Sequence, residues 1–378
     1  MDELTALRRD LHAHPELGFE EHRTARIVAE RLEAAGIAVH RGLGRTGVVG
    51  TLRRGSGNGV VALRADMDAL AMPEKTGLPW ASTAPGRMHA CGHDGHTAML
   101  VGAAERLARE GGFDGTVHFV FQPAEEGRGG ARAMLEDGFL RLFPADHVFG
   151  LHNMPGLAPD QIAVVDGPQL ASSDSWTVTF RGVGTHGAKP HLGRDAVTAA
   201  GQFLAAVHSI VAREVDPLQP AVISACALAG GDFEALNVIP DDVRIGGTAR
   251  AYAPEVRDVL EVAIGRLANG IAAAMGVSCD YRFQRRIPPV VNHSGVARLA
   301  RAAAARAGRM LDSFPPSTAG DDFAFFSAEV PGAYVWLGNG PARDGALHHN
   351  TGYDFCDDAI PTGVAFWVEL VRECLPVR

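Results

Sequence analysis

The order in which strands and helices are expected along the chain constrains the fold more than any other feature of this 378-residue sequence. Apolar residues recur at helical spacing in two N-terminal segments, near residues 4–11 and 21–35. From there to about residue 151, β-rich runs alternate with helical patterns. This alternation is typical of a mixed α/β sheet that is covered by helices on both faces.

A second pattern interrupts the first. A strand, a helix, two strands, a helix and a strand follow one another within about 110 residues, and this βαββαβ order is typical of a ferredoxin-like α+β domain. We therefore expect residues 1–172 and 286–378 to form one discontinuous α/β domain, with residues 173–285 as a second domain inserted between its halves.

Composition and charge exclude several classes of partner. The 35 Lys and Arg residues stand against 44 Asp and Glu, which gives a net charge of −9 without any basic run. We therefore expect neither nucleic acid nor a membrane surface as a partner. The five cysteines form an odd set without a CxxC pair, and the N-terminal segment has no apolar core typical of a signal peptide. These features favour a reducing, cytoplasmic location.

The densest group of potential metal ligands lies in residues 88–96. The segment MHACGHDGH places one thiol, three imidazoles and one carboxylate within nine residues at the expected start of a helix. Cys and His are natural ligands of zinc and similar divalent ions. The alternative is a polar helix start in which Asp94 caps the first turn and the histidines are solvated.

Glu125 and Glu126 form a second group, directly after an expected strand that ends at Phe121. Adjacent carboxylates repel each other, so a cation beside them is expected. If one carboxylate binds a metal ion, the other is free to take a proton from a water molecule that the metal polarises. Two solvated acids at a helix start are the alternative.

Histidines form the remaining groups. His152 directly follows an expected strand over residues 147–151, and His348 and His349 lie one loop beyond a later strand. Ligands of open α/β sheets bind outside the carboxyl ends of the strands, where these groups are expected to meet. One thiolate, one Glu and three imidazoles from separate segments predict a site for two metal ions.

Seven motifs occur in a fixed order along the chain: LRADMDAL, MHACGHDGH, FQPAEEG, GLHNMP, GTHGAKPH, NVIPD and HHNTGYDF. Together they resemble the metal-dependent amidohydrolases that include hippurate hydrolase, the auxin-conjugate hydrolases and bacterial N-acyl-amino-acid amidohydrolases. This subgroup belongs with aminoacylase-1 and carboxypeptidase G2 in one metallopeptidase superfamily. The resemblance extends from about Leu7 to Pro361, which is nearly the whole chain.

The resemblance implies a set of metal ligands. Cys91 matches the thiolate that bridges two ions, and His93, His152, Glu126 and His349 match the other ligands.

The choice between two adjacent histidines rests on counting. The family has its ligand four residues before Tyr-Asp-Phe, which selects His349 over His348, although Thr351 stands where Pro is common. A second departure is the segment GDDF, residues 320–323, where the family often has Glu-Asp-Phe, and no role is assigned there.

The resemblance also implies catalytic and substrate-binding residues. Glu125 matches the general base. His186 matches a histidine that reaches an active site, often that of the partner subunit, and polarises the scissile carbonyl. Asn237 and Arg250 match positions that contact substrate, and an Arg is suited to a substrate carboxylate.

The function implied is hydrolysis of the amide bond of small-molecule N-acyl amino acids by the discontinuous catalytic domain. Two divalent ions, drawn from Zn, Mn, Co and Ni, would serve as cofactors. The inserted domain would act as a lid through which a homodimer or homotetramer forms. A dipeptidase or carboxypeptidase of the same superfamily, a cysteine amidase with Cys91 as nucleophile, and a metal-stabilised binding protein are the alternatives.

Overall fold

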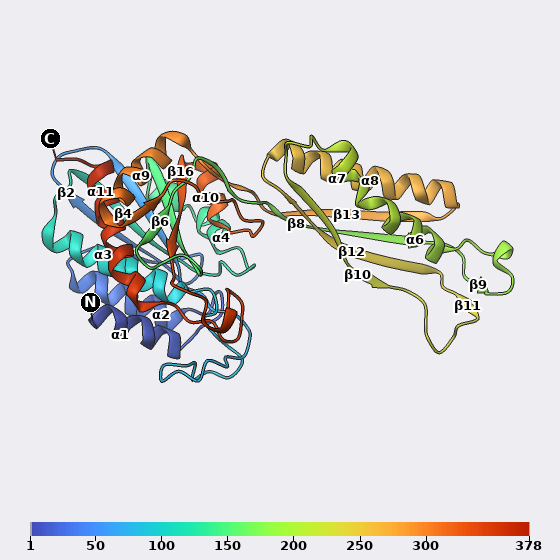
Figure 1. Ribbon diagram of the computed structural model, residues 1–378, viewed down its shortest axis with the longest axis horizontal. Helices are drawn as coiled ribbons and strands as arrows, with labels where there is room; N and C mark the ends of the chain where they lie inside the picture. The colour runs from blue at the N-terminus through green and yellow to red at the C-terminus, as the bar shows by residue number, and fades with distance from the viewer. Residues whose placement is uncertain (1, 378) are drawn as a thin grey trace. The chain divides into compact units, whose positions relative to one another are not determined.

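A computed structural model describes residues 2–377 of the chain, which divide into two compact units (Figure 1). The first unit contains the chain up to Gly167, Val291–Pro315 and the chain from Asp322 onward; the second contains Pro168–Val290 and Pro316–Asp321. The short segment 316–321 belongs to the second unit because Ser317 donates its N–H to the carbonyl of Gln169 and accepts from the N–H of Ala171.

An eight-stranded mixed sheet forms the centre of the first unit. Its strands are β1 (Ala38–Leu43), β2 (Gly47–Arg54), β3 (Val60–Asp66), β4 (Gly115–Gln122), β5 (His147–Met154), β6 (Gln161–Ala163), β15 (Arg309–Leu311) and β16 (Gly332–Gly338). Their order in the sheet is β1-β2-β4-β3-β5-β16-β6-β15. The central strands β4, β3, β5 and β16 are parallel to one another. β2 pairs with β4 and β6 pairs with β16 in antiparallel fashion, and the edge strands β1 and β15 are antiparallel to β2 and parallel to β6, respectively.

The central parallel strands are covered on both faces. All residues of β4 and β16 are buried, and such strands are expected to have long apolar runs. Several strands extend further than the sequence pattern predicted, and two of them, expected over residues 60–64 and 147–151, matter for the site. β3 reaches Asp66, and β5 reaches Met154, so that His152 lies inside the strand instead of after it. Both extensions place polar side chains at the carboxyl ends of these strands.

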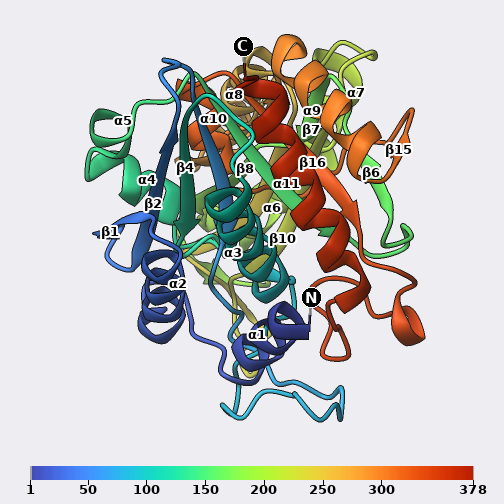
Figure 2. The same ribbon diagram turned by 90° about the vertical axis from the view of Figure 1, so that its left-hand side faces the viewer.

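Helices cover both faces of this sheet, as Figure 2 shows. One layer contains α1 (Asp2–Ala13), α2 (His22–Ala34), α3 (His93–Glu110), α9 (Ser294–Ala307) and α11 (Ile360–Cys374), and the other contains α4 (Gly130–Glu136), α5 (Phe139–Leu142) and α10 (Phe323–Glu329). Consecutive residues of β5 face opposite layers: Phe149 lies in the core with the first layer, and Gly150 faces Phe323 of α10. The expected α/β class is confirmed.

The second unit is a four-stranded antiparallel sheet with helices. Its main elements are β8 (Ser173–Arg181), α6 (Ala196–Val207), α7 (Ser209–Glu214), β10 (Ala221–Ala229), β12 (Asp242–Ala251), α8 (Pro254–Met275) and β13 (Ser278–Ile287). The sheet order β10-β12-β8-β13 and the βαββαβ order along the chain are ferredoxin-like, as predicted. In β8, Trp176, Val178 and Phe180 are buried, while Ser175 and Thr177 are partly exposed, because successive strand residues face opposite sides.

One helix predicted in this unit is interrupted. Hydrophobic spacing predicts a single helix over residues 195–213, but the structure has two helices, α6 and α7, that meet at His208. The hydroxyl of Ser209 donates to the carbonyl of Ala206 at 2.6 Å, and such a side-chain bond bends helices.

Short elements complete the chain: β7 (Gly167–Leu170), β9 (Thr185–His186), β11 (Val238–Ile239), β14 (Val290–Asn292) and 3₁₀ helices at Pro190–Leu192, Arg343–Gly345 and Asp357–Ala359. Among the residues described, no helix is both long enough and apolar enough to cross a membrane.

Candidate metal centre

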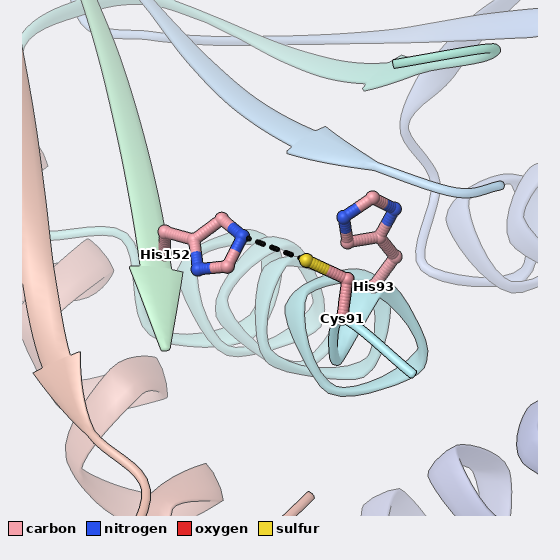
Figure 3. Close-up of side chains that lie close together, drawn as sticks. All are labelled: Cys91, His93 and His152. Carbon is pink, nitrogen blue, oxygen red and sulfur yellow. Dashed lines mark hydrogen bonds between the residues drawn. The ribbon is translucent and has the colours of Figure 1, made fainter. Parts of the chain in front are cut away.

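A thiol and two imidazoles meet where α3 begins beside β5. Gly92 immediately precedes α3 with a φ of 88°, and a Cβ at this position would lie 2.3 Å from the side-chain nitrogen of Asn153. Only glycine is suited to this turn, which places Cys91 just outside the helix and His93 at its first residue. Figure 3 shows the Cys91 sulfur pointing toward His152, with the His93 ring beside it.

Hydrogen bonds to main-chain oxygens occupy the same nitrogen, Nδ1, on both imidazoles. Nδ1 of His93 lies 2.9 Å from the carbonyl oxygen of Asp68, and Nδ1 of His152 lies 2.8 Å from that of Asn153. A carbonyl only accepts, so each Nδ1 carries a proton and each Nε2 is available as a metal ligand. The Nε2 of His152 lies 3.4 Å from the Cys91 sulfur. The Nε2 of His93 is buried and has no hydrogen-bond partner among the described residues.

A second group of ligand atoms shares the same thiol. The Cys91 sulfur, a carboxylate oxygen of Glu126 and a ring nitrogen of His349 lie within 4.8 Å of one another, as do the ligand atoms of Cys91, His93 and His152. Nε2 of His349 lies 3.2 Å from Oε1 of Glu126. The hydrogen bonds from His349 to Cys91 and Glu126 raise the pKa of His349 to about 10. The structure thus brings all five predicted ligands into two overlapping groups of three.

The electrostatics of these groups favour a cation. Burial lowers the pKa of His93, but the charge of Asp66 and the contacts with Asp68 and Cys91 outweigh burial, so the net pKa is raised. In the absence of metal, the raised pKa favours a proton on Nε2 of His93, and a divalent ion would displace this proton when it binds. Burial, followed by the charge of Glu126, raises the pKa of the Cys91 thiol, so the thiolate also needs a cation beside it.

The donor set fits two divalent ions. Sulfur, imidazole nitrogen and carboxylate oxygen are the ligands of zinc and of similar transition metals. Three protein ligands in each group leave a position open for water or substrate, which distinguishes catalytic metal sites from closed structural ones.

The two adjacent histidines of the late motif separate in space. The main-chain N–H of His349 donates to the carbonyl of Ala90 at 2.8 Å, which holds His349 beside Glu126. Nε2 of His348 instead lies 2.9 Å from the side-chain oxygen of Asn153, and burial lowers the pKa of His348 to about 3. A neutral His348 therefore donates to Asn153 and lies in neither ligand group.

Glu125 reaches the same space from a strained turn after β4. Ala124 has a φ of 54°, and its N–H donates to the buried carboxylate of Glu21 at 2.7 Å. This turn directs the buried Glu125 side chain inward, where its carboxylate lies within 4.8 Å of ligand atoms of His93 and Glu126.

Sequence reasoning missed two acidic residues, Asp66 and Asp68, that lie beside the proposed ligands. Asp68 accepts from Nδ1 of His93 through its main-chain oxygen, and its carboxylate accepts the N–H of Glu126 at 2.9 Å. Asp66 accepts from Nδ1 of His96 at 2.6 Å. Both acids stand in LRADMDAL at the carboxyl end of β3, and this position next to the sheet edge was the available signal.

Asp322 lies in the segment to which no role was assigned, and the structure shows what it does. It is fully buried, and its carboxylate accepts from Gln122 at 2.6 Å, from Arg64 at 3.2 Å and from the N–H of Ala131 at 2.9 Å. The carboxylate therefore joins β3, β4 and the start of α4, which carry or flank the site.

Removal of this carboxylate is expected to destabilise the first unit. Asp322→Ala leaves Arg64 without one of its buried partners, which costs about 3–5 kcal/mol of unfolding free energy. Urea denaturation measures this loss, and the exposed Asp312→Ala serves as the control, with a change of less than about 0.5 kcal/mol. An equal effect of the two substitutions would contradict the assigned role.

The remaining predicted residues lie in the second unit. His186 on β9 is exposed, and its Nδ1 accepts from the N–H of Ala188 at 3.0 Å. Asn237 lies next to this segment, since its carbonyl accepts from the N–H of Gly187 at 2.7 Å. Arg250 lies on β12, half-buried, and its Nη1 donates to the carbonyl of Ala249 at 2.9 Å.

The fold and this donor set define a metal-dependent hydrolase. The chain belongs to the peptidase family M20/M25/M40, whose sequence pattern matches residues 62–373.

Characterised relatives and a solved structure agree with this assignment. The hippurate hydrolase of Campylobacter jejuni is 38% identical over 376 residues, which cover 99% of this chain and 97% of that protein. The N-acetylcysteine deacetylase of Bacillus subtilis is 37% identical and covers 97% and 95%. The structure of the Bacillus subtilis YXEP protein, described as a dinuclear metal binding peptidase from the M20 family, matches with a TM-score of 0.86 and 34% identity over 98% and 97% of the two chains. The family resemblance indicated by the motifs is confirmed.

Proposed function

We propose that the chain hydrolyses the amide bond of N-acyl amino acids, releasing a carboxylate and a free amino acid, with two divalent ions as cofactors. As a member of its family the chain is an amidohydrolase, and hippurate and N-acetylcysteine are both N-acyl amino acids. The observation that carries the proposal is the pair of three-ligand groups that share Cys91, with Glu125 beside them.

We assign one ion to each of the two groups. Cys91, His93 and His152 would hold one ion, and Cys91, Glu126 and His349 the other. When bound, divalent ions supply Lewis acidity, which can lower the pKa of water to about 7. Zn, Mn, Co and Ni all suit these donors.

Glu125 is the proposed general base. Its carboxylate belongs to neither three-ligand group but lies within 4.8 Å of ligand atoms of His93 and Glu126, where it would accept a proton from the attacking water and return it to the leaving nitrogen. The burial of Glu125 keeps this exchange out of bulk water.

His186 is the proposed oxyanion donor. Its Nδ1 accepts a main-chain N–H, so the neutral ring carries its proton on Nε2 and can donate to the carbonyl oxygen under attack. Asn237 and Arg250 would contact the substrate, with the guanidinium pairing its carboxylate.

Residues 1–172 with 286–378 would act as the catalytic domain and residues 173–285 as the lid. We place the protein in the cytoplasm as a homodimer or homotetramer that associates through the lid, with His186 acting in its own or the partner subunit.

Substrate assays test the proposal. N-acetyl and N-benzoyl amino acids and matched dipeptides are compared with Zn, Mn, Co and Ni in turn. The expected kcat/KM is about 100-fold higher for the best N-acyl amino acid than for its dipeptide counterpart. A preference for the dipeptide would establish a peptidase instead.

A further inference from the structure

A buried arginine of the N-terminal helix connects two segments that are distant in the sequence. Arg8 of α1 is completely buried. Its Nη1 lies 2.9 Å from Asp354 and 3.7 Å from Asp94, and its Nε donates to Asp357 at 2.6 Å. Three carboxylates from two parts of the chain thus surround one guanidinium. Because the guanidinium is planar, its hydrogen bonds to them have fixed directions.

One of these segments carries His93. Asp94 is the next residue of α3, and its Oδ2 lies 2.8 Å from Nδ1 of the buried His12. Although burial lowers the pKa of His12, the adjacent Asp94 raises it to about 9. The start of α3 is therefore held by two cations of α1, Arg8 and His12.

The other segment carries His349. Asp354 and Asp357 follow this histidine after a short loop, and Asp354 also accepts from the indole N–H of Trp80 at 3.2 Å. Arg9 lies 3.7 Å above the Trp80 ring and donates to Asp357 at 2.8 Å. The loop has further contacts, since the N–H of His349 donates to the carbonyl of Ala90 and Nε2 of His348 donates to Asn153, but the His349 side chain itself is half-exposed and its backbone adopts a φ of 61°.

We propose that Arg8 is a positioning residue for the metal centre, which sets His349 against Cys91 and Glu126 by linking Asp94 to Asp354 and Asp357. The inference rests on the proposed two-metal function. A guanidinium with three acidic partners fixes the relative position of the two segments in a way that apolar packing does not, since its hydrogen bonds have defined directions.

Loss of Arg8 is expected to affect the two ligand groups differently. The group formed by Cys91, His93 and His152 comes from the start of α3 and from β5. β5 lies inside the sheet, and without Arg8 the start of α3 keeps the contact of Asp94 with His12. The group that includes His349 depends on the loop that Arg8 anchors. Loss of Arg8 should therefore weaken the binding of one ion and leave the binding of the other unchanged.

Stepwise titration of the metal-free protein with Co(II) tests this prediction, with the thiolate charge-transfer absorption as the readout. In Arg8→Met, one binding event is expected to weaken about 10- to 100-fold and the other to stay unchanged. The weakened event should be the one that His349→Ala abolishes. Arg8→Lys, which keeps the charge but loses the planar fork, should restore binding only in part.

Two further variants keep the test decisive. Asp354→Asn preserves the shape of one partner and should show the same selective loss in smaller measure, even if Arg8→Met does not fold. Arg31→Met removes a bidentate pair with Glu105, 2.7 and 3.0 Å long, that joins α2 to α3 without reaching the ligand segments, and it should change neither event.

Other results overturn the proposal. Unchanged affinities in folded Arg8→Met and Asp354→Asn, equal weakening of both events, or the same loss in Arg31→Met would each refute the positioning role. A wild-type protein that binds fewer than two Co(II) ions would instead refute the proposed two-metal function.

Discussion

Replacing Glu125 by Gln is expected to lower kcat by about 10²- to 10⁴-fold, with two ions per subunit still bound. The amide has nearly the size of the carboxylate but cannot accept a proton at neutral pH. Because the ligand groups are complete without Glu125, metal binding should survive. Steady-state kinetics with an N-acyl amino acid and metal analysis of the same sample measure the two effects.

Glu329→Gln provides the matched control, since Glu329 is exposed at the end of α10. It should keep wild-type kcat and metal content. If Glu125→Gln kept wild-type turnover, Glu125 would not be the base. If this variant lost an ion together with its activity, Glu125 would be a ligand instead.

Replacing Cys91 by Ala is expected to abolish both turnover and tight binding of both ions. Its sulfur is the only ligand atom common to the two three-ligand groups, so each group falls to two protein ligands in the variant. Equilibrium dialysis followed by metal analysis measures the ions retained.

Cys226→Ala tests whether the loss is specific to this thiol, because Cys226 is free and exposed on β10. It should bind two ions and retain activity. A Cys91→Ala protein that still bound two ions tightly would show that the sulfur does not bridge them. If it bound no metal but remained active after treatment with a chelator, the metal-dependent mechanism would be wrong.

The fold was predictable because the pattern of apolar and polar residues that specifies each strand and helix is local and periodic. Alternation in β8 and the apolar runs of β4 and β16 follow directly from which faces are buried. The break at His208 was not predicted, because the hydrophobic spacing continues through it and does not reveal the side-chain hydrogen bond from Ser209 to the carbonyl of Ala206. The strands β3 and β5 were predicted, but their ends were not, because Asp66, His152 and Asn153 are polar and lie at the site.

The residues proposed as ligands and as the base were predictable from the sequence, but the buried residues that position them were not. Cys91 and Glu125 lie in short motifs rich in potential metal ligands, and the residue types alone indicate the chemistry. Asp322 and Arg8 are fully buried charges whose partners lie 258 and 346 residues away in the sequence, respectively, as the contacts with Arg64 and Asp354 show. Hydrophobic periodicity contains no information about such pairings. Tertiary structure alone reveals them.

The most direct test of the account is the activity of the wild-type protein on an N-acyl amino acid as a function of metal ions bound per subunit. Protein stripped with a chelator is expected to be inactive, and activity should return as a divalent ion is added back, reaching its maximum at two ions per subunit. Full activity in the stripped protein, with no gain on adding any of the four metals, would contradict the account.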